Sequence, residues 1–207
     1  VIQLATRDSK AQIGAINLNG NDAKAQIGVI NYARTSTASI GVINIVPRGH
    51  TSVDALISEN GTLLAGVTHG GHYVRNTYAA GARFDKGGTQ NVLALGLGAR
   101  LFTHRRANLD LDLLHEVYVE YESWDVLAQT DRLKITTAVW VHERVGVLGS
   151  VGYGLMYSDR SEIDPGAPFG QSTFNGPDAR GQGGFYGFPS LSLGVRVMLT
   201  DPKRPER

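Results

Sequence analysis

The chain has 207 residues, 42% hydrophobic content and a formal net charge of +1 from 20 basic and 19 acidic residues. This length allows one good-sized domain, alone or with a small appendage. The balanced charge, with no evident basic face, argues against nucleic acid as the main partner. The chain contains no cysteine, which excludes a disulfide framework and a thiolate metal site. No run approaches 18 consecutive apolar residues, so a membrane-spanning helix is also excluded.

A seven-residue motif recurs near the N-terminus, as AQIGAIN (Ala11–Asn17), AQIGVIN (Ala25–Asn31) and ASIGVIN (Ala38–Asn44). Spacings of 14 and then 13 residues predict stacked coils of a β-solenoid over residues 1–47, with isoleucines inside and asparagines in ladders. An antiparallel meander, in which each copy is one strand and its turn, is the alternative. Because the chain begins inside a further copy, we expect a processed or incomplete N-terminus.

Alternating apolar and polar side chains beyond Pro47–His50 predict eight strands. Their approximate ranges are 51–58, 62–69, 72–84, 90–103, 109–123, 131–142, 145–157 and 185–200. A tilted strand needs about 9–11 residues to cross a bilayer, and most of these runs reach that length. We therefore predict an all-β fold in which residues 48–207 form an antiparallel transmembrane-type β-barrel behind the β-solenoid-like repeat segment. Ser158–Gly184, rich in Gly, Pro, Asp and Ser, is predicted to be an extended mobile loop.

The polar face of the predicted strands carries glycine, serine and charges of both signs. Unpaired charges inside a small barrel are costly, so we expect them to pair in the lumen. The predicted lumen network consists of Arg83, Arg100, Asp110, Asp112, Glu116, Glu120, Lys134 and Arg196. Because eight strands leave an interior that side chains just fill, a closed network is favoured over a polar translocation path.

Aromatic residues towards the strand ends predict an interfacial girdle. They are Tyr73, Phe84, Phe102, Tyr121, Trp124, Tyr157, Phe185, Tyr186 and Phe188. The connections at Gly70–Gly71, His104–Asn108 and Glu143–Arg144 are short, as are the periplasmic turns of bacterial barrels. An even strand number then places both termini in the periplasm.

The IG-x-IN repeats followed by alternating strands resemble bacterial surface-repeat proteins of the kind found in spirochaete genomes. Residues 51–200 resemble small outer-membrane β-barrels in architecture. These resemblances imply a bacterial outer-membrane location, with outer-membrane lipid as a partner and other envelope proteins or self-association as further ones. They transfer no catalytic residues. One departure is the last strand, which ends at Leu199 before a polar tail, where many such barrels end in an aromatic residue used in assembly.

We therefore expect an outer-membrane structural or surface-interaction protein, a barrel anchor that presents repeats and loops without cofactor or catalysis. The alternatives are a lipid-modifying outer-membrane enzyme, a narrow pore, and a soluble repeat adhesin whose strands form a sandwich. For an enzyme, His142, Glu143 and Ser150 are the candidates, although their spacing forms no nucleophile–base pair and no GxSxG motif is present.

Three further histidines could belong to a site. His69 and His72 flank Gly70–Gly71 without an accompanying carboxylate or cysteine at ligand spacing, so no metal site is predicted there. His115 interrupts an apolar row, and we expect it to lie near an interface or to pair with a neighbouring strand.

Overall fold

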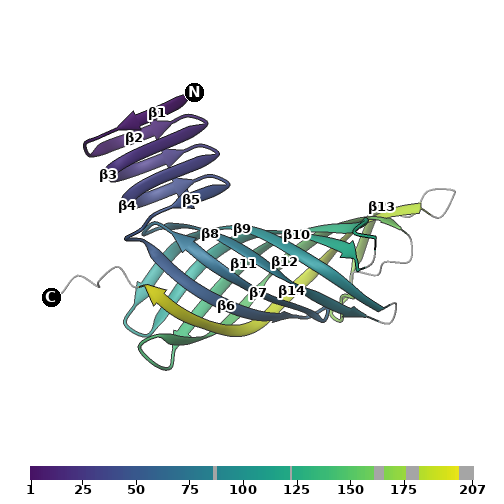
Figure 1. Ribbon diagram of the computed structural model, residues 1–207. Coiled ribbons are helices and arrows are strands. Elements are labelled where there is room, and N and C mark those ends of the chain that lie inside the picture. The colour runs from purple at the N-terminus through teal and green to yellow at the C-terminus, as the bar shows by residue number, and fades with distance from the viewer. Residues whose placement is uncertain (86–87, 122, 161–165, 176–181, 201–207) are drawn as a thin grey trace.

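The computed structural model describes residues 1–85, 88–121, 123–160, 166–175 and 182–200. All regular elements in this part of the chain are β-strands, and none of the described residues forms a helix able to cross a membrane. Figure 1 shows two bodies, a flat stack of short strands at the N-terminus and a long barrel. The N-terminal strands are β1 (Ile2–Ala5), β2 (Ser9–Ile13), β3 (Ile16–Ile27), β4 (Ile30–Ile40) and β5 (Ile43–Ile45).

The N-terminal strands pair in parallel, with equivalent repeat positions side by side. Ile16 pairs with Ile30, and Ile30 with Ile43, so the register steps by one repeat from coil to coil. Each coil has two straight segments, because β3 pairs with β1 along its first part and with β2 along its last part. The predicted β-solenoid is confirmed, and the antiparallel meander is wrong.

The interior of the repeat stack is polar. Asn17 donates from Nδ2 to Oδ1 of Asn31 at 2.8 Å, and Asn31 donates in the same way to Asn44 at 2.7 Å. Gln26 is also fully buried and donates to Gln12 Oε1 at 2.8 Å. The asparagine ladders are therefore present as predicted.

The prediction that isoleucines stack inside this solenoid is wrong. Ile13, Ile27 and Ile40 are 65%, 46% and 42% exposed, whereas all three ladder asparagines are buried. The reason is the two-residue alternation of a strand: residues of one parity point inward, and the asparagines and glutamines occupy that parity. Interior amides that satisfy one another from coil to coil leave the apolar side chains outside.

The barrel is a closed antiparallel sheet of eight strands, β6–β12 and β14. They are β6 (His50–Ser58), β7 (Thr62–Gly70), β8 (Val74–Asp85), β9 (Gly88–His104), β10 (Ala107–Glu120), β11 (Val126–Trp140), β12 (Val145–Arg160) and β14 (Gln182–Thr200). Each strand pairs with its sequence neighbour, and closure comes from β14, which pairs with β12 on one side and β6 on the other. The predicted eight-strand barrel is confirmed, and the sandwich required by the soluble-adhesin alternative is wrong.

The predicted Ser158–Gly184 loop is only partly a loop. Strand β12 continues to Arg160, β14 begins at Gln182, and β13 (Ser172–Asn175) pairs with β14 between them. The prediction of an extended segment without strands is therefore wrong for these residues, because β12 and β14 pair beyond the rim of the other strands. Residues 161–165 and 176–181 of the predicted loop, and the polar tail 201–207, lie outside the described residues.

The repeat stack is joined to the barrel beside β8. Backbone amides of His72 and Tyr73 donate to the carbonyls of Ser36 and Thr37, both at 3.0 Å. Figure 1 shows the stack rising from the barrel end at which β6 begins and β14 ends. We call this the short-turn end, because the connections 71–73, 105–106 and 141–144 lie there.

Candidate functional site: a charged lumen and an apolar wall

The outer wall of the barrel is apolar around its circumference. Leu93, Leu113, Leu133, Val151 and Leu193 come from different strands and are between 47% and 65% exposed. Residues of the opposite parity point into the lumen and are mostly buried. A soluble protein rarely exposes such a large contiguous apolar surface. The wall has the polarity of a surface that contacts hydrocarbon, and the molecule is therefore a membrane β-barrel.

The described side chains form two ion-pair clusters in the lumen. The first, which we call the short-turn cluster, lies nearer the repeat stack. Asp54 accepts two hydrogen bonds from Arg196, at 2.8 and 2.7 Å. Asp110 lies 2.8 Å from Arg75 and 3.1 Å from Arg100, and all its side-chain surface is buried. Pairing every buried carboxylate with a guanidinium offsets the cost of removing both from water.

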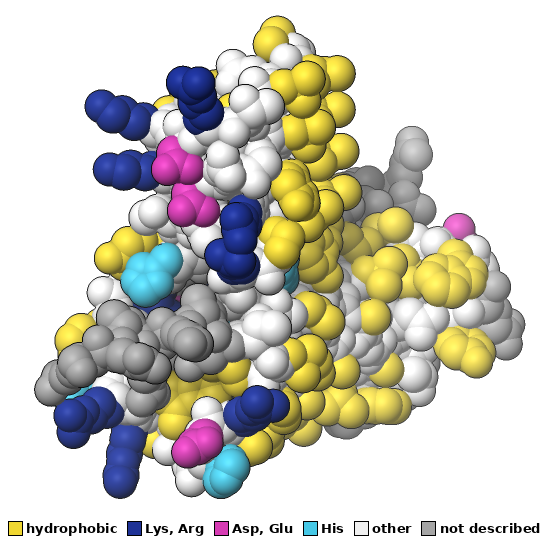
Figure 2. Space-filling model, turned by 60° about the vertical axis from the view of Figure 1, so that its left-hand side comes forward, with side chains coloured by type: hydrophobic (Ala, Val, Ile, Leu, Met, Phe, Trp, Pro, Cys, Tyr) yellow, Lys and Arg dark blue, Asp and Glu magenta, His cyan; other side chains and the backbone are white. Residues whose placement is uncertain are grey.

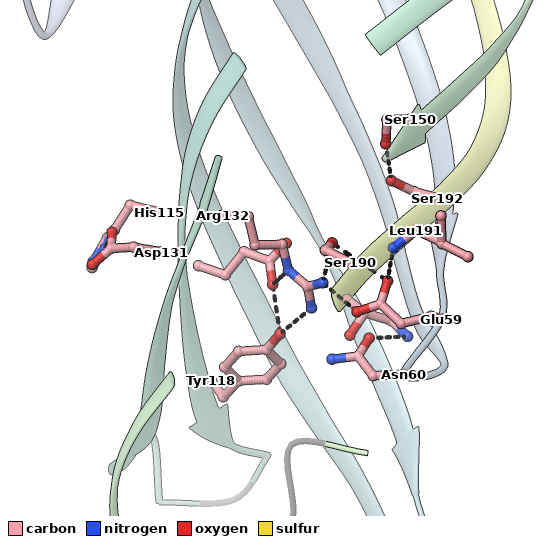
Figure 3. Close-up of polar contacts among 12 residues, drawn as sticks. Glu59, Asn60, His115, Tyr118, Asp131, Arg132, Ser150, Ser190, Leu191 and Ser192 are labelled. Carbon is pink, nitrogen blue, oxygen red and sulfur yellow. Dashed lines mark hydrogen bonds and ion pairs between the residues drawn. The ribbon is translucent and has the colours of Figure 1, made fainter. Parts of the chain in front are cut away.

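The second cluster is organised by Arg132, and we call it the Arg132 cluster. Figure 3 shows its guanidinium group between Glu59 and Tyr118, with Ser190 close by. Nη1 lies 2.5 Å from Glu59 Oε1, and Nε lies 3.0 Å from Glu116 Oε2. Glu116 also accepts a hydrogen bond from the Tyr118 hydroxyl at 2.5 Å. Arg132 and both carboxylates are at most 1% exposed, so strands β10 and β11 are tied across the lumen to the β6–β7 turn.

The residues predicted for the lumen are placed as follows. Four lie in the short-turn cluster, namely Arg100, Asp110, Asp112 and Arg196. Glu116 belongs to the Arg132 cluster. Arg83 is buried, with its guanidinium carbon 5.7 Å from the centre of the Tyr118 ring.

The other two predicted lumen residues are Lys134 and Glu120. Lys134 is buried beside a small cavity between the clusters. Glu120 lies at the end of β10, where it accepts a hydrogen bond from Ser123 Oγ at 2.8 Å.

Sequence reasoning missed four charged lumen residues: Asp54, Glu59, Arg75 and Arg132. Arg132 stands two positions before Lys134 and Arg75 eight before Arg83, so strand parity alone was enough to find both. Asp54 lies on the weakly alternating first strand. Glu59 lies in a turn, where the sequence contains no signal that its side chain points into the lumen.

The lumen also contains an apolar cluster that the polar-network prediction did not include. Tyr118, Met156, Tyr186 and Phe188 pack together at the end opposite the repeat stack. Phe188 is fully buried and Tyr186 is 8% exposed, so their assignment to the outer girdle is wrong. Both have the inward parity of β14, whereas Tyr73, Phe84, Phe102, Tyr121, Trp124 and Tyr157 are at least half exposed.

The lumen has little free space among the described side chains. The cavity bounded by Asp54, Asp112, Lys134 and Arg196 has a volume of about 40 Å³. This part of the barrel therefore has room for a few water molecules and not for a larger solute.

The remaining histidine candidates have defined surroundings. His69 uses both ring nitrogens, since Nε2 bonds to the Val46 amide at 3.0 Å and Nδ1 to the Thr51 hydroxyl at 2.8 Å. His142 lies in the β11–β12 turn, whereas Ser150 points into the lumen and bonds to Ser192 at 2.5 Å. The structure does not bring these two enzyme candidates together, and Glu143 lies beside His142 in the same turn.

His115 does pair with a neighbouring strand. Its Nδ1 lies 2.8 Å from Oδ1 of Asp131, and the two side chains are 41% and 61% exposed. Figure 3 shows the pair set apart from the Arg132 cluster. Because both residues have outward parity, this polar pair lies on the lipid-facing wall.

Comparisons with known proteins give the following findings. No family model and no curated protein matches the chain. Among solved structures, a de novo designed transmembrane β-barrel matches at 11% identity over 73% of this chain and 96% of that chain, with a TM-score of 0.43. The N-terminal barrel domain of Pseudomonas aeruginosa OprF matches at 12% over 72% and 98%, with a TM-score of 0.42. Neisserial surface protein A matches at 10% over 72% and 94%, with a TM-score of 0.36.

Proposed function

We propose that this protein is a bacterial outer-membrane anchor whose barrel is closed to solutes and holds the repeat stack at the periplasmic face. The observation that carries the proposal is the reversed polarity of the barrel. Apolar side chains form its outer wall, and paired charges fill its lumen. Antiparallel barrels of even strand number with polar interiors are characteristic of bacterial outer membranes.

The direction of insertion follows from the connections. The turns at the short-turn end resemble the short periplasmic turns of bacterial barrels, whereas the 160–182 connection lies at the other end. The repeat stack shares the short-turn end. In this orientation the repeat stack is on the periplasmic side, where it can contact envelope proteins or a second copy of the chain. The 160–182 connection is on the exterior side.

Two measurements test this proposal. The folded protein, reconstituted in vesicles, should migrate differently on a gel before and after boiling, and it should give no single-channel conductance in a planar bilayer. Protease added to intact cells should leave an epitope at residue 1 uncut until the outer membrane is permeabilised. Cleavage in intact cells would refute the orientation, and stable conductance would refute the closed lumen.

A lipid-modifying enzyme is the second candidate, and the His115–Asp131 pair is the observation that favours it. A histidine oriented by a carboxylate is the usual arrangement of a general base, and this pair faces lipid. In this candidate scheme water attacks the ester carbonyl and His115 takes its proton. Release of fatty acid from phospholipid vesicles by the wild type, abolished in His115→Ala, would establish this activity. Unchanged lipid would refute it.

A further inference from the structure

The repeat stack has one apolar edge and one charged edge. At each IG-[AV]-I bend the coil turns, and Ile13, Ile27, Ile40, Val29 and Val42 project outward with 42–65% of their surfaces exposed. At the opposite bends stand Arg7, Asp8 and Arg34, all exposed. Figure 2 shows the hydrophobic side chains as a continuous stripe along one side of the stack, with Lys, Arg and Asp on the other.

This apolar edge is not needed for the packing of the solenoid, because the interior is filled by buried asparagine, glutamine, serine and alanine. In water, an edge of exposed isoleucine and valine repeated in every coil would be a persistent apolar surface without a partner. The chain therefore places its most hydrophobic repeat positions where only something outside the stack can cover them.

The barrel shows which way the edge faces. The polar flank of the last full coil meets the short turn of the barrel, where His72 bonds to Ser36. The bend of that coil meets the wall further along β8, where the Tyr78 hydroxyl bonds to the Val42 carbonyl at 2.5 Å. The edge is thus displaced from the short turn towards the lipid-facing wall, and the charged edge points away from it.

A groove joins the edge to the wall. It has a volume of about 520 Å³, and its lining is mostly apolar, with Ile27 and Val29 on one side and Leu95, Leu97 and Leu113 on the other. The His115–Asp131 pair also borders this groove. The three leucines belong to the wall that contacts hydrocarbon. The apolar surface of the repeats is therefore continuous with the lipid-facing surface of the barrel.

We infer that the repeat stack lies flat on the bilayer, with its apolar edge immersed among the acyl chains of the periplasmic leaflet and its charged edge in water. The occupant of the groove is a phospholipid acyl chain. An amphipathic element that lies in the membrane interface buries its apolar face and keeps its charged face wet in the same way. This inference rests on the proposed membrane anchor and adds a second membrane-contacting surface to it.

Single cysteines test the inference, because the chain has none of its own. Val29→Cys on the apolar edge, Arg34→Cys on the charged edge and Leu193→Cys on the barrel wall are each labelled with an environment-sensitive fluorophore. The full-length variants are placed in phosphatidylethanolamine–phosphatidylglycerol vesicles with and without spin-labelled phospholipid. Ile13→Cys, in the outermost coil, replaces Val29→Cys if that variant loses heat-modifiable migration.

We expect the labels at Val29 and Leu193 to be blue-shifted and to lose most of their fluorescence to the lipid quencher, while the label at Arg34 is unaffected. The unlabelled thiol at position 29 should react with a water-soluble maleimide at least roughly tenfold more slowly than that at position 34, because a thiol in hydrocarbon does not ionise to the reactive thiolate.

The other outcomes overturn the inference in distinguishable ways. Quenching at Leu193 with a water-exposed label at Val29 would leave the barrel in the membrane and refute the contact of the repeats with lipid. A thiol at Val29 that is protected from maleimide but whose label is not quenched by lipid would show that a second protein copy covers the edge. Loss of quenching at Leu193 as well would refute the membrane anchor itself.

Discussion

Replacing Arg132 by methionine directly tests the closed lumen. Arg132 lies 2.5 Å from Glu59 and 3.0 Å from Glu116, and all three side chains are at most 1% exposed. Methionine keeps much of the apolar stem but removes the charge, so two buried carboxylates lose their cation. Breaking a buried ion pair by removing one partner costs about 3–5 kcal/mol. We expect a loss of that size in the free energy of unfolding, or roughly two to four orders of magnitude in the folding equilibrium constant.

The assay is urea-induced unfolding in phospholipid vesicles, followed by the fluorescence of Trp124 and Trp140 and extrapolated linearly to zero denaturant. The control is the triple variant R132M/E59Q/E116Q, which removes the three charges together. Neutral replacement of a whole buried charge set is often close to neutral in stability, so this variant should recover most of the loss. A stability of R132M within about 1 kcal/mol of the wild type would refute the reasoning, because it would mean that water or mobile ions compensate these carboxylates.

Three further substitutions probe the repeats and the wall. Asn31→Leu removes the three side-chain hydrogen bonds of the central ladder residue, which join it to Asn17, Ile40 and Asn44. It should destabilise the stack by about 2–4 kcal/mol, seen as faster proteolysis of the repeats with unchanged heat-modifiable migration of the barrel. Gly28→Ala would place a Cβ 2.2 Å from the backbone oxygen of the preceding coil and should have the same effect, whereas Gly20→Ala, with nothing within 4 Å, should not; equal proteolysis of the two would contradict the stacking. His115→Leu leaves Asp131 without its partner on the lipid-facing wall and should lower the free energy of unfolding in vesicles by about 1–3 kcal/mol. The double variant H115L/D131L should be as stable as the wild type. A double variant less stable than the single one would contradict this prediction, because it would show that the pair stabilises the wall.

The barrel could be predicted from the sequence because its strands alternate between apolar and polar side chains at a regular period. Every strand must show an apolar face to the outside, and a run such as Leu109–Tyr121 shows that alternation directly in the sequence. The observed strands differ from the predicted ones chiefly at their ends. The largest difference is at the start of β11, where Val126–Trp140 begins at 126 rather than at the predicted 131. Pairing with β10, whose register reaches Val126, extends this strand beyond the local alternation.

The interior of the repeats was harder to predict, because periodicity reports which residues share a face and not which face is inside. Isoleucine and asparagine alternate in IG-x-IN, so either could have pointed inward. Burial of hydrophobic side chains favours isoleucine inside when water surrounds the coil. Asparagine occupies the interior here because each side-chain amide bonds to its equivalent in the next coil, as Asn17 does to Asn31. This arrangement is compatible with an outer edge that contacts lipid instead of water.

Sequence periodicity also does not predict which charged residues form pairs in the lumen. Parity correctly separates Arg100, Asp110 and Arg196 from the apolar wall, yet it does not tell which strands face one another across the barrel. Asp54 and Arg196 are 142 positions apart and form a two-bond pair only because closure brings β6 beside β14. Such contacts depend on closure, and no local pattern contains them.

The asparagine ladder finally explains how the two bodies hold one orientation. An end coil of a solenoid leaves unpaired groups, and repeat proteins need a cap to satisfy them. Here the barrel is that cap: Asn44 donates from Nδ2 to Oδ1 of Asn76 on β8, and Asn76 donates back to the Gly41 carbonyl at 2.6 Å. Asn76 has outward parity on a largely apolar wall, a position that would be costly against lipid. Its burial under the last coil keeps this amide away from lipid, and the bonds it makes there fix the stack at the angle that turns its apolar edge along the same wall.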